Sequence, residues 1–432
     1  MTQTDLCTGL LEFIAASPTP FHATRSLAAL LCESGFTRLN EKDAWQLQEG
    51  GRYFVVRGGS SLVAFAYGST ALAENGFRVI GAHTDSPCLK VKPSPELQTK
   101  GYYQLGIEVY GGALLNPWYD RDLSLAGNVV YLDASGELRS TLIDFVEPIA
   151  TIPSLAIHLD REANTSRTVN PQTDMNVLLR QSDDKINFRA MLSELIDDDV
   201  QEVLDFNLSF YDTQPPGVVG LGKEFIASAR LDNLLSCYLG AKALLNSAGE
   251  HTSILLCSDH EEVGSRSDIG AQGPLLEEII GRLAGDQEAR QRAMRRSVLI
   301  SADNAHGVHP NYSKVHDDQH GPLLNKGPVI KFDANQSYAT NSSTSALVRW
   351  LAKGNDADIP LQQYVTRADM RCGSTIGPIT AAGLGITAVD IGLATFAMHS
   401  VRELAGKHDL GHMYELLSRF VSRKALPALD SL

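Results

Sequence analysis

The spacing of hydrophobic residues predicts two helices and a β-hairpin at the start of the chain. An amphipathic stretch over residues 6–16 ends at a Ser-Pro-Thr-Pro segment, because proline stops a helix, and a second helical stretch covers residues 22–35. Two β-rich runs, at residues 52–58 and 61–68, are separated by a short Gly-Gly-Ser turn. Such a pair is typical of a hairpin.

The middle of the chain has a different pattern. After a short apolar run at residues 77–83 that suits a buried strand, residues 89–224 consist mainly of strand-like and turn-like segments. One patch, residues 191–206, has helical spacing. We therefore expect a separate β-rich module over residues 89–224.

Helices and strands alternate again in the second half of the chain, which favours an α/β sheet. The expected helices are residues 230–247, 274–297, 344–354 and 375–385, and the expected strands are residues 252–259, 298–303, 328–334, 362–367 and 387–392. The first elements match this half better than the middle. The sequence thus predicts an α/β fold in which a discontinuous domain, residues 1–88 and 225–432, has a central mixed sheet flanked by helices and is interrupted by the β-rich domain.

Composition narrows the possible partners and the compartment. The 432 residues carry a formal net charge of −14, which opposes binding to nucleic acid or to an anionic membrane. Six scattered cysteines form no Cys-x-x-Cys pair, and the first residues lack the basic start of a secretory signal. No run approaches the roughly 18 apolar residues of a membrane helix. We expect a cytoplasmic protein.

Polar residues able to bind metal follow several of the expected strands, where open α/β sheets place their ligands. They are His83, Glu261, Glu262, Asp303 and His399, and Asp232 precedes an expected helix. Histidines with carboxylates suit zinc, cobalt or manganese. Each residue also has a structural alternative: a hydrogen-bonded strand histidine for His83, an exposed acidic loop for the glutamates, and a helix N-cap for Asp232.

Two short motifs favour the functional alternative. In His83-Thr84-Asp85, side chains two residues apart on a strand face the same way, so Asp85 can orient the imidazole as a hydrogen-bond partner. In the Glu261-Glu262 doublet, one carboxylate can coordinate metal while the other takes a proton from the attacking water.

A second group of histidines, His306, His309, His316 and His320, lies in a loop with irregular spacing. The irregular spacing favours a solvated loop over a metal site.

Five ordered blocks of this sequence resemble the aspartyl aminopeptidase family of dinuclear zinc metallopeptidases. The blocks are GAHTDSP (residues 81–87), SARLDN (228–233), DHEEVGS (259–265), SADNAHGVHPNY (301–312) and MHSVRE (398–403). SPTPFHA near the start and IPSLAIHLDR around His158 resemble the same family, so the likeness spans nearly the whole chain.

The resemblance implies an active site with two zinc ions per subunit. Asp232 would bridge the ions, one also held by His83 and Asp303 and the other by Glu262 and His399. Glu261 would be the general base. Cobalt or manganese can substitute for zinc in such a centre.

The resemblance also implies a substrate and an assembly. A lysine at the position of Lys331, with Tyr338 nearby, would pair with an acidic N-terminal residue, so that Asp and then Glu are preferred in peptides with a free N-terminus. His158, in the inserted dimerisation domain, would reach the active site of a neighbouring subunit and stabilise the oxyanion. Dimers would build a tetrahedral dodecamer.

Three alternatives remain open at this point. The chain could be an aminopeptidase that prefers neutral residues, or an N-acyl amino acid deacylase or carboxypeptidase with the same metal pair. A non-catalytic, metal-stabilised assembly protein is the third, which the complete set of ligand and base positions disfavours.

Overall fold

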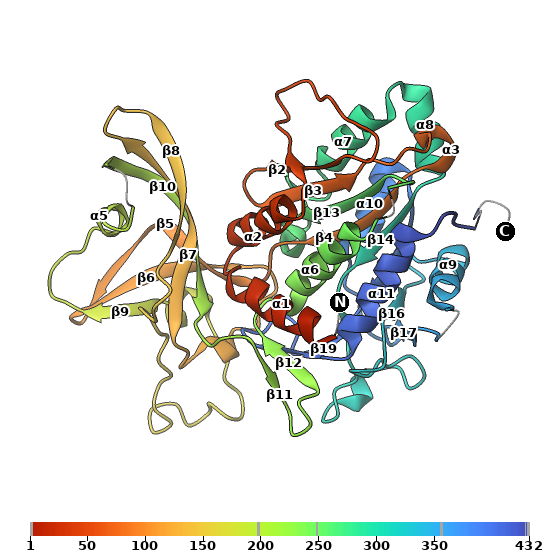
Figure 1. Ribbon diagram of the computed structural model, residues 1–432. Helices are drawn as coiled ribbons and strands as arrows, with labels where there is room; N and C mark the ends of the chain where they lie inside the picture. Colours follow the sequence, from red (N-terminus) through yellow and green to blue (C-terminus); the bar gives the residue numbers. More distant parts are fainter. Residues whose placement is uncertain (1–2, 197–198, 248, 355–356, 428, 430–432) are drawn as a thin grey trace. The chain divides into compact units, whose positions relative to one another are not determined.

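The chain divides into two compact units in the computed structural model, which describes residues 3–196, 199–247, 249–354, 357–427 and 429 (Figure 1). The first unit comprises Met1–Asp85, Pro216–Met398 and Glu403–Leu432, and the second comprises Ser86–Pro215 and His399–Arg402. The expected boundaries, after residue 88 and before residue 225, lie a few residues C-terminal to the observed ones, which follow Asp85 and Pro215. The return of residues 399–402 to the second unit was not predicted.

The first unit contains all but two of the α-helices that the structure describes. Its helices are α1 (Gln3–Ala15), α2 (Pro20–Glu33), α3 (Leu72–Asn75), α6 (Leu231–Leu245), α7 (Leu275–Ala284), α8 (Gln287–Arg295), α9 (Ser342–Ala352), α10 (Ile376–Leu384) and α11 (Asp409–Ser422), with 3₁₀ turns η2 (Glu261–Val263) and η3 (Ser313–Val315). Its strands are β1 (Thr37–Arg38), β2 (Arg52–Arg57), β3 (Ser61–Ala66), β4 (Arg78–His83), β11 (Gly217–Val219), β12 (Phe225–Ser228), β13 (Ser253–Ser258), β14 (Val298–Ala302), β15 (Ala305–His306), β16 (Val329–Phe332), β17 (Gln362–Val365), β18 (Thr387–Gly392), β19 (Ala394–Phe396) and β20 (Glu403–Gly406).

A nine-stranded mixed sheet forms the centre of the first unit. The strand order is β1-β2-β3-β13-β4-β14-β18-β16-β17. The four strands β13, β4, β14 and β18 run parallel, whereas β3 and β16 are antiparallel to their neighbours β13 and β18. This arrangement confirms the predicted mixed α/β fold. It also brings the carboxyl ends of the central strands to one edge of the sheet.

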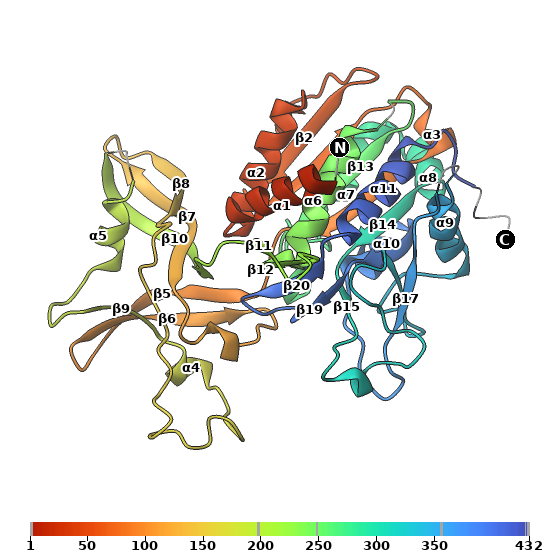
Figure 2. The same cartoon turned by 60° about the horizontal axis from the view of Figure 1, so that its bottom comes forward.

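Helices cover both faces of this sheet (Figure 2). On β13 the side chains alternate: Leu255 and Cys257 face the core formed with α1, α2, α6, α9 and α11, whereas Ile254 and Leu256 face the core formed with α7 and α8. Strand side chains alternate in this way because successive residues point to opposite faces. A sheet buried on both faces explains why its strands read as continuous apolar runs.

Helix α6 lies close to the sheet because it carries a glycine where it crosses β4 and β13. A Cβ atom added at Gly240 would lie 2.8 Å from Leu255 Cδ1 and 3.2 Å from Ile80 Cγ2. Any larger side chain would therefore push the helix or the strands outward. The position of α6 matters for the site described below, because Asp232 lies at its start.

A six-stranded antiparallel sheet, in the order β8-β7-β10-β5-β6-β9, forms the second unit. The strands are β5 (Cys88–Thr99), β6 (Tyr102–Tyr110), β7 (Leu123–Asp133), β8 (Leu138–Asp144), β9 (Val177–Gln181) and β10 (Val200–Asp212); α4 (Pro171–Asp174), α5 (Phe188–Ser193) and η1 (Asn116–Trp118) are its short helices. Val401 is buried in the core of this unit, which explains why residues 399–402 belong to it.

Three sequence predictions of secondary structure were wrong or incomplete. The helix expected over residues 274–297 is two helices, α7 and α8, because Gly285 has a φ of 81° and ends α7. The helical patch expected over residues 191–206 gives way to strand β10, and residues 197–198 lie outside the described part of the chain. Helix α11 was not predicted at all.

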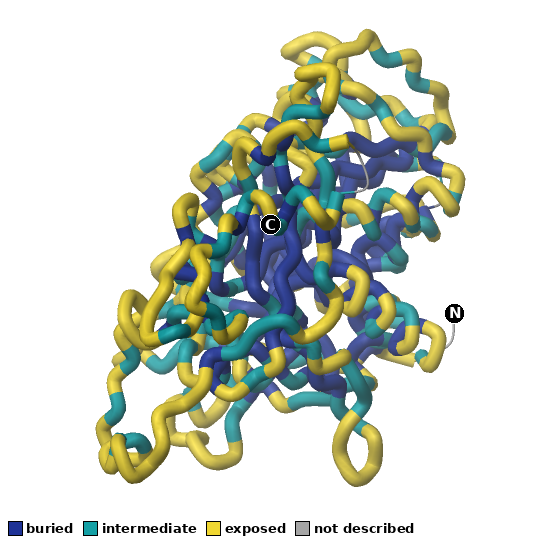
Figure 3. Tube along the Cα trace, turned by 90° about the vertical axis from the view of Figure 1, so that its left-hand side faces the viewer, coloured by how far each residue is buried: buried dark blue, intermediate teal, exposed yellow. Residues whose placement is uncertain are grey.

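Burial separates the interior from the surface clearly. The buried residues concentrate in the strands and the inner helix faces, and the outer loops are exposed (Figure 3). Among the described residues, no helix combines the length and the apolar character that crossing a bilayer requires.

The close packing of α6 generates a stability prediction. Gly240→Val should lower the free energy of unfolding by about 1–3 kcal/mol, because the added methyl groups meet Leu255 and Ile80. The matched control is Gly281→Val on α7, where an added Cβ has no neighbour within 4 Å. Chemical denaturation of both variants measures the difference, and equal stability would show that α6 can move without cost.

Candidate metal centre

Three strand ends of the central sheet bring ionisable side chains to the same edge. His83 is the last residue of β4 and pairs in register with Ser258, the last residue of β13. Asp303 directly follows β14, which runs parallel to β4. Because all three strands end at this edge, residues distant in sequence become neighbours.

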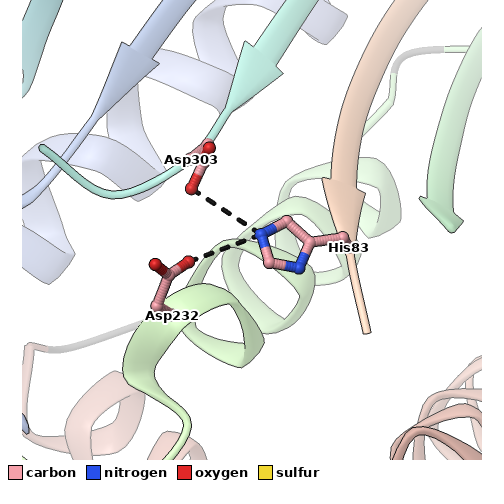
Figure 4. Close-up of side chains that lie close together, drawn as sticks. All are labelled: His83, Asp232 and Asp303. Carbon is pink, nitrogen blue, oxygen red and sulfur yellow. Dashed lines mark ion pairs between the residues drawn. The ribbon is translucent and has the colours of Figure 1, made fainter. Parts of the chain in front are cut away.

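His83 is the centre of this cluster. Its Nε2 atom lies 3.4 Å from Asp232 Oδ1 and 3.7 Å from Asp303 Oδ1, and Figure 4 shows both carboxylates directed toward the same ring nitrogen. All three residues are buried, and each offers a ligand atom within 4.8 Å of the other two. The geometry is that of a site able to hold one cation between an imidazole and two carboxylates.

Asp85 connects this histidine to the glutamate doublet. The His83 Nδ1 atom lies 3.0 Å from the backbone oxygen of Asp85 and 3.4 Å from its Oδ1 atom. The same carboxylate accepts hydrogen bonds from the backbone N–H of Glu261, at 3.1 Å, and of Glu262, at 3.0 Å. A proton on Nδ1 is thereby held toward Asp85, which leaves the Nε2 lone pair available to a metal.

The doublet lies in a tight 3₁₀ turn directly after β13. The turn is flanked by His260 and Gly264, whose φ angles are 65° and 92°. Glu261 Oε2 lies 4.0 Å from His83 Nε2, and Glu261, Glu262 and His83 also form a group with ligand atoms within 4.8 Å. The glutamates are partly buried, so the alternative of an exposed acidic loop is wrong.

The concentration of carboxylates changes the protonation of the site. Burial, together with the nearby Asp303, Asp85 and Asp232, raises the pKa of Glu261 to about 7 against the opposing effect of His83. Burial and Asp232 raise the pKa of Glu262 well above its usual value. Burial alone would lower the pKa of His83, but its contacts with Asp232, Asp303 and Asp85 raise it well above the usual value.

These shifts and the types of donor fit a bound divalent cation. Five carboxylates surround or adjoin one imidazole, and burial, followed by their mutual repulsion, raises the pKa values of the two glutamates. A divalent cation would offset this negative charge. Imidazole nitrogen and carboxylate oxygen are ligands that zinc accepts.

Asp232 is held by a residue that the sequence interpretation did not single out. Its backbone N–H donates to Oε2 of Glu403 at 2.9 Å, and both residues are buried. Asp232 and Asn233 have non-helical backbone angles, so the regular part of α6 begins after them. Glu403 closes the MHSVRE block, and this is the only signal in the sequence that could have indicated it.

Lys331 and Tyr338 lie together beside Asp303. The Lys331 Nζ atom donates to the backbone oxygen of Asn304 at 3.0 Å and lies 3.6 Å from Asp303 Oδ2. It also lies 4.9 Å from the centroid of the Tyr338 ring. The side chain is only 2% exposed, and the buried Asp390 also interacts with its charge. Part of the lysine charge is therefore already balanced.

The two remaining predicted site residues belong to the second unit. His399 has a φ of 68°, and its Nδ1 atom lies 3.2 Å from the backbone oxygen of Gly112. His158 is exposed, next to the exposed side chains of Ile157 and Leu159. One ring nitrogen of His399 is thus in contact with the backbone. His158 lies on an exposed loop with apolar neighbours.

The histidine-rich loop contains no cluster of metal ligands within the described residues. The backbone N–H of His309 donates to Nε2 of His316 at 3.4 Å, and His320 is paired with Asp317 at 2.7 Å. The ring of His306 packs against Tyr364. Local hydrogen bonds and ring contacts account for these histidines.

Comparison with known proteins assigns the chain to a family. A family profile described as "Aminopeptidase I zinc metalloprotease (M18)" matches residues 13–421. A "Probable M18 family aminopeptidase 2" from Ectopseudomonas mendocina (strain ymp) is 56% identical over 429 residues, covering 98% of this chain and 99% of that protein.

Solved structures agree with this assignment. The chain is similar to one in the "Cryo-EM structure of the Ape4 and Nbr1 complex", with a TM-score of 0.92, 36% identity, and coverage of 97% of this chain and 86% of that one. It is also similar to one in the structure of an S. cerevisiae mApe1 dodecamer, with a TM-score of 0.84, 30% identity and 96% coverage of both chains. With a buried histidine–carboxylate cluster at its sheet edge and these matches along nearly its whole length, the chain belongs to the M18 family of zinc aminopeptidases.

Proposed function

We propose that this M18 zinc aminopeptidase removes N-terminal Asp and Glu residues from peptides with two zinc ions per chain. Asp232 would be shared by both ions, His83 and Asp303 would complete one ligand set, and Glu262 and His399 would complete the other. The observation that carries the proposal is the convergence of Asp232 and Asp303 on the Nε2 atom of His83. Bound zinc supplies Lewis-acid polarisation of the scissile carbonyl, a more acidic water and an attachment point for the free amino terminus.

Glu261 is the general base in this proposal. Its carboxylate takes a proton from the attacking water and passes it to the leaving amine. This role requires a carboxylate that lies next to the metal ligands but does not itself bind the metal. Asp85 fixes the backbone of Glu261 and Glu262 and faces the ring of His83. The Asp85 carboxylate therefore holds the base, Glu261, in a fixed position relative to the metal ligand His83. This contact supports the assignment of Asp85 as a positioning residue.

The acidic preference rests on Lys331. Its ammonium group is a positive charge beside Asp303, with the ring of Tyr338 alongside. A substrate carboxylate in this neighbourhood would gain a favourable interaction in a site that is otherwise strongly negative. Because Asp303 and Asp390 already balance part of this charge, we expect a preference rather than an absolute requirement.

We also propose that the second unit is a dimerisation module and that dimers build a dodecamer. One solved relative is described as a dodecamer. The exposed loop with Leu155, Ile157 and Leu159 beside His158 supplies apolar surface that suits a subunit contact. His158 would then stabilise the oxyanion in a neighbouring subunit.

Substitution of the base tests the mechanism. Glu261→Gln should lower kcat by about 10²–10⁴-fold while the bound zinc stays near the wild-type amount, because the amide keeps the shape but cannot accept the proton. Initial rates on an Asp-peptide and elemental analysis measure the two quantities. Turnover at the wild-type rate would show that Glu261 is not the base.

Two controls separate the roles of the carboxylates. Glu277→Gln, at an exposed glutamate on α7, should change neither rate nor metal content. Asp232→Ala should release metal, because the residue serves both ions in the proposal. Retention of two ions per chain in Asp232→Ala would rule out its bridging role.

Replacement of the lysine tests the substrate preference. Lys331→Met should reduce kcat/KM for Asp- and Glu-peptides by about ten-fold or more relative to Leu-peptides, because the positive charge is removed. The matched control is Lys326→Met at an exposed lysine. An unchanged Asp-to-Leu ratio would favour the neutral-residue alternative, and cleavage restricted to N-acetyl-Asp substrates would favour a deacylase.

Complementation tests the role of His158. His158→Ala and Glu261→Gln chains, each of low activity alone, should regain activity after mixing and subunit exchange, since some sites would then combine an intact base with an intact histidine. Exchange is verified by mass spectrometry of differently labelled chains. No recovery after verified exchange would contradict action between subunits.

A further inference from the structure

The first unit contains a cavity at the end of the sheet opposite to the metal centre. The cavity has a volume of about 420 Å³. It is lined by Glu74, Asn75, Phe77, Arg78, His251, Arg295, Arg296, Ser297, Val298, Thr387, Ala425, Leu426, Pro427 and Leu429. Arg78, Val298 and Thr387 are the first residues of β4, β14 and β18. We call it the Arg78 cavity.

The charged groups around this cavity are mainly cationic. Three arginines, Arg78, Arg295 and Arg296, line it together with a single carboxylate, Glu74. That carboxylate forms an ion pair with Arg292, a residue that does not line the cavity, and also lies 4.0 Å from Arg296. The positive charge of the cavity is therefore not balanced by its own lining, although the whole chain is acidic.

Arg78 is the most unusual of these residues because it is only 4% exposed. Its Nη1 atom donates to the backbone oxygens of Phe420 and Val421, at 3.2 and 3.3 Å, in the last turn of α11. None of the ion pairs found among the described residues includes Arg78. A guanidinium group has five N–H donors, and carbonyl oxygens at one of its nitrogen atoms leave donors for another acceptor.

Burying such a charge is unfavourable unless an anion offsets it. The carboxylate of Glu250 interacts with the charge of Arg78 but does not line the cavity. Burial lowers the pKa of Arg78 to about 10, so the group still carries its charge near neutral pH. Burial and the charge of Arg78 also lower the pKa of the neighbouring His251, against the opposing effects of Glu250 and of the backbone oxygen of Lys424, which the Nε2 atom of His251 contacts. An anion entering the cavity would offset the charge that the lining leaves uncompensated.

The rest of the lining is mixed, because Asn75, Ser297 and Thr387 lie beside apolar side chains. Phe77, Val298, Leu426 and Leu429 supply hydrocarbon surface next to the cationic groups. A volume of about 420 Å³ lies within the usual range of small-ligand pockets, which combine an apolar lining with a few polar anchors.

We propose that the Arg78 cavity binds a small anion, a carboxylate or phosphate carried on an apolar group. Arg78 contacts the anion from the floor of the cavity, and Arg295 and Arg296 contact it from the rim. The site is distinct from the metal centre, because Arg78 begins strand β4 and His83 ends it.

Calorimetric titration of the zinc-loaded protein tests this site with three defined probes. Inorganic phosphate, acetate and benzoate, titrated at low ionic strength, separate a requirement for phosphate from one for a carboxylate with an apolar group. Benzoate should bind more tightly than acetate, because it also covers the apolar lining. Arg295→Gln/Arg296→Gln and Arg78→Gln should each weaken the tightest probe by about ten-fold or more.

Two controls separate the cavity from the rest of the protein. Arg290→Gln removes an arginine of α8 that pairs with Glu277 and does not line the cavity, and it should bind the probes like the wild type. Asp232→Ala should also retain binding, which distinguishes the cavity from an anion bound at the zinc ions.

The double variant is decisive, because both of its arginines are exposed and their loss should not affect folding, whereas Arg78→Gln removes contacts to α11. Wild-type affinity in Arg295→Gln/Arg296→Gln would overturn the proposal. Loss of binding in Asp232→Ala, or no binding of any probe at millimolar concentration, would overturn it as well.

Discussion

The carboxylate of Asp85 is the constraint on which the candidate site depends. It accepts two backbone N–H groups from the Glu261–Glu262 turn and faces the ring of His83. Strand pairing already joins β4 to β13, and the Asp85 carboxylate extends this connection to the glutamate turn after β13. Because its two oxygen atoms bind separate backbone groups, it fixes the turn in two places and so limits its rotation.

The central sheet is the second feature that positions the site. Parallel strands β4, β13 and β14 deliver their carboxyl ends to one edge, and α6 delivers Asp232 to the same edge. Gly240 lets α6 approach the strands closely enough for this. The functional carboxylates therefore come from rigid elements or from turns tied to them, which suits a site that must keep several like charges together.

Much of the fold and of the candidate site could be predicted from the sequence, because the patterns that indicate them lie within short segments. Apolar runs predicted the strands, and the polar residues after them predicted the cluster of His83 and Asp303 with the glutamate turn. The helix expected over residues 191–206 failed because β10 pairs with β7 along most of its length, and tertiary pairing overrides local helical spacing.

Other contacts could not be predicted, because in each of them a side chain meets a backbone group from a distant segment of the chain. The hydrogen bond from Asp232 to Glu403 and the contact of Lys331 with Asn304 depend on the register of strands that are far apart in the sequence. No spacing rule encodes such contacts. The sequence pattern marked His399 as a metal-binding candidate, whereas the role of His158 came from the family resemblance alone, and both assignments remain predictions.

The insertion of the second unit has a consequence for synthesis on the ribosome. Within the part of the chain that the structure describes, strand β4 pairs only with β13 and β14, and both are translated after the whole segment Ser86–Pro215. Both edges of β4 thus lack partners while the second unit emerges, and an apolar strand with open edges can pair with another chain. The same topology that brings the metal ligands together creates an interval in which the nascent chain depends on helices α1 and α2, the hairpin β2–β3 or a chaperone for protection.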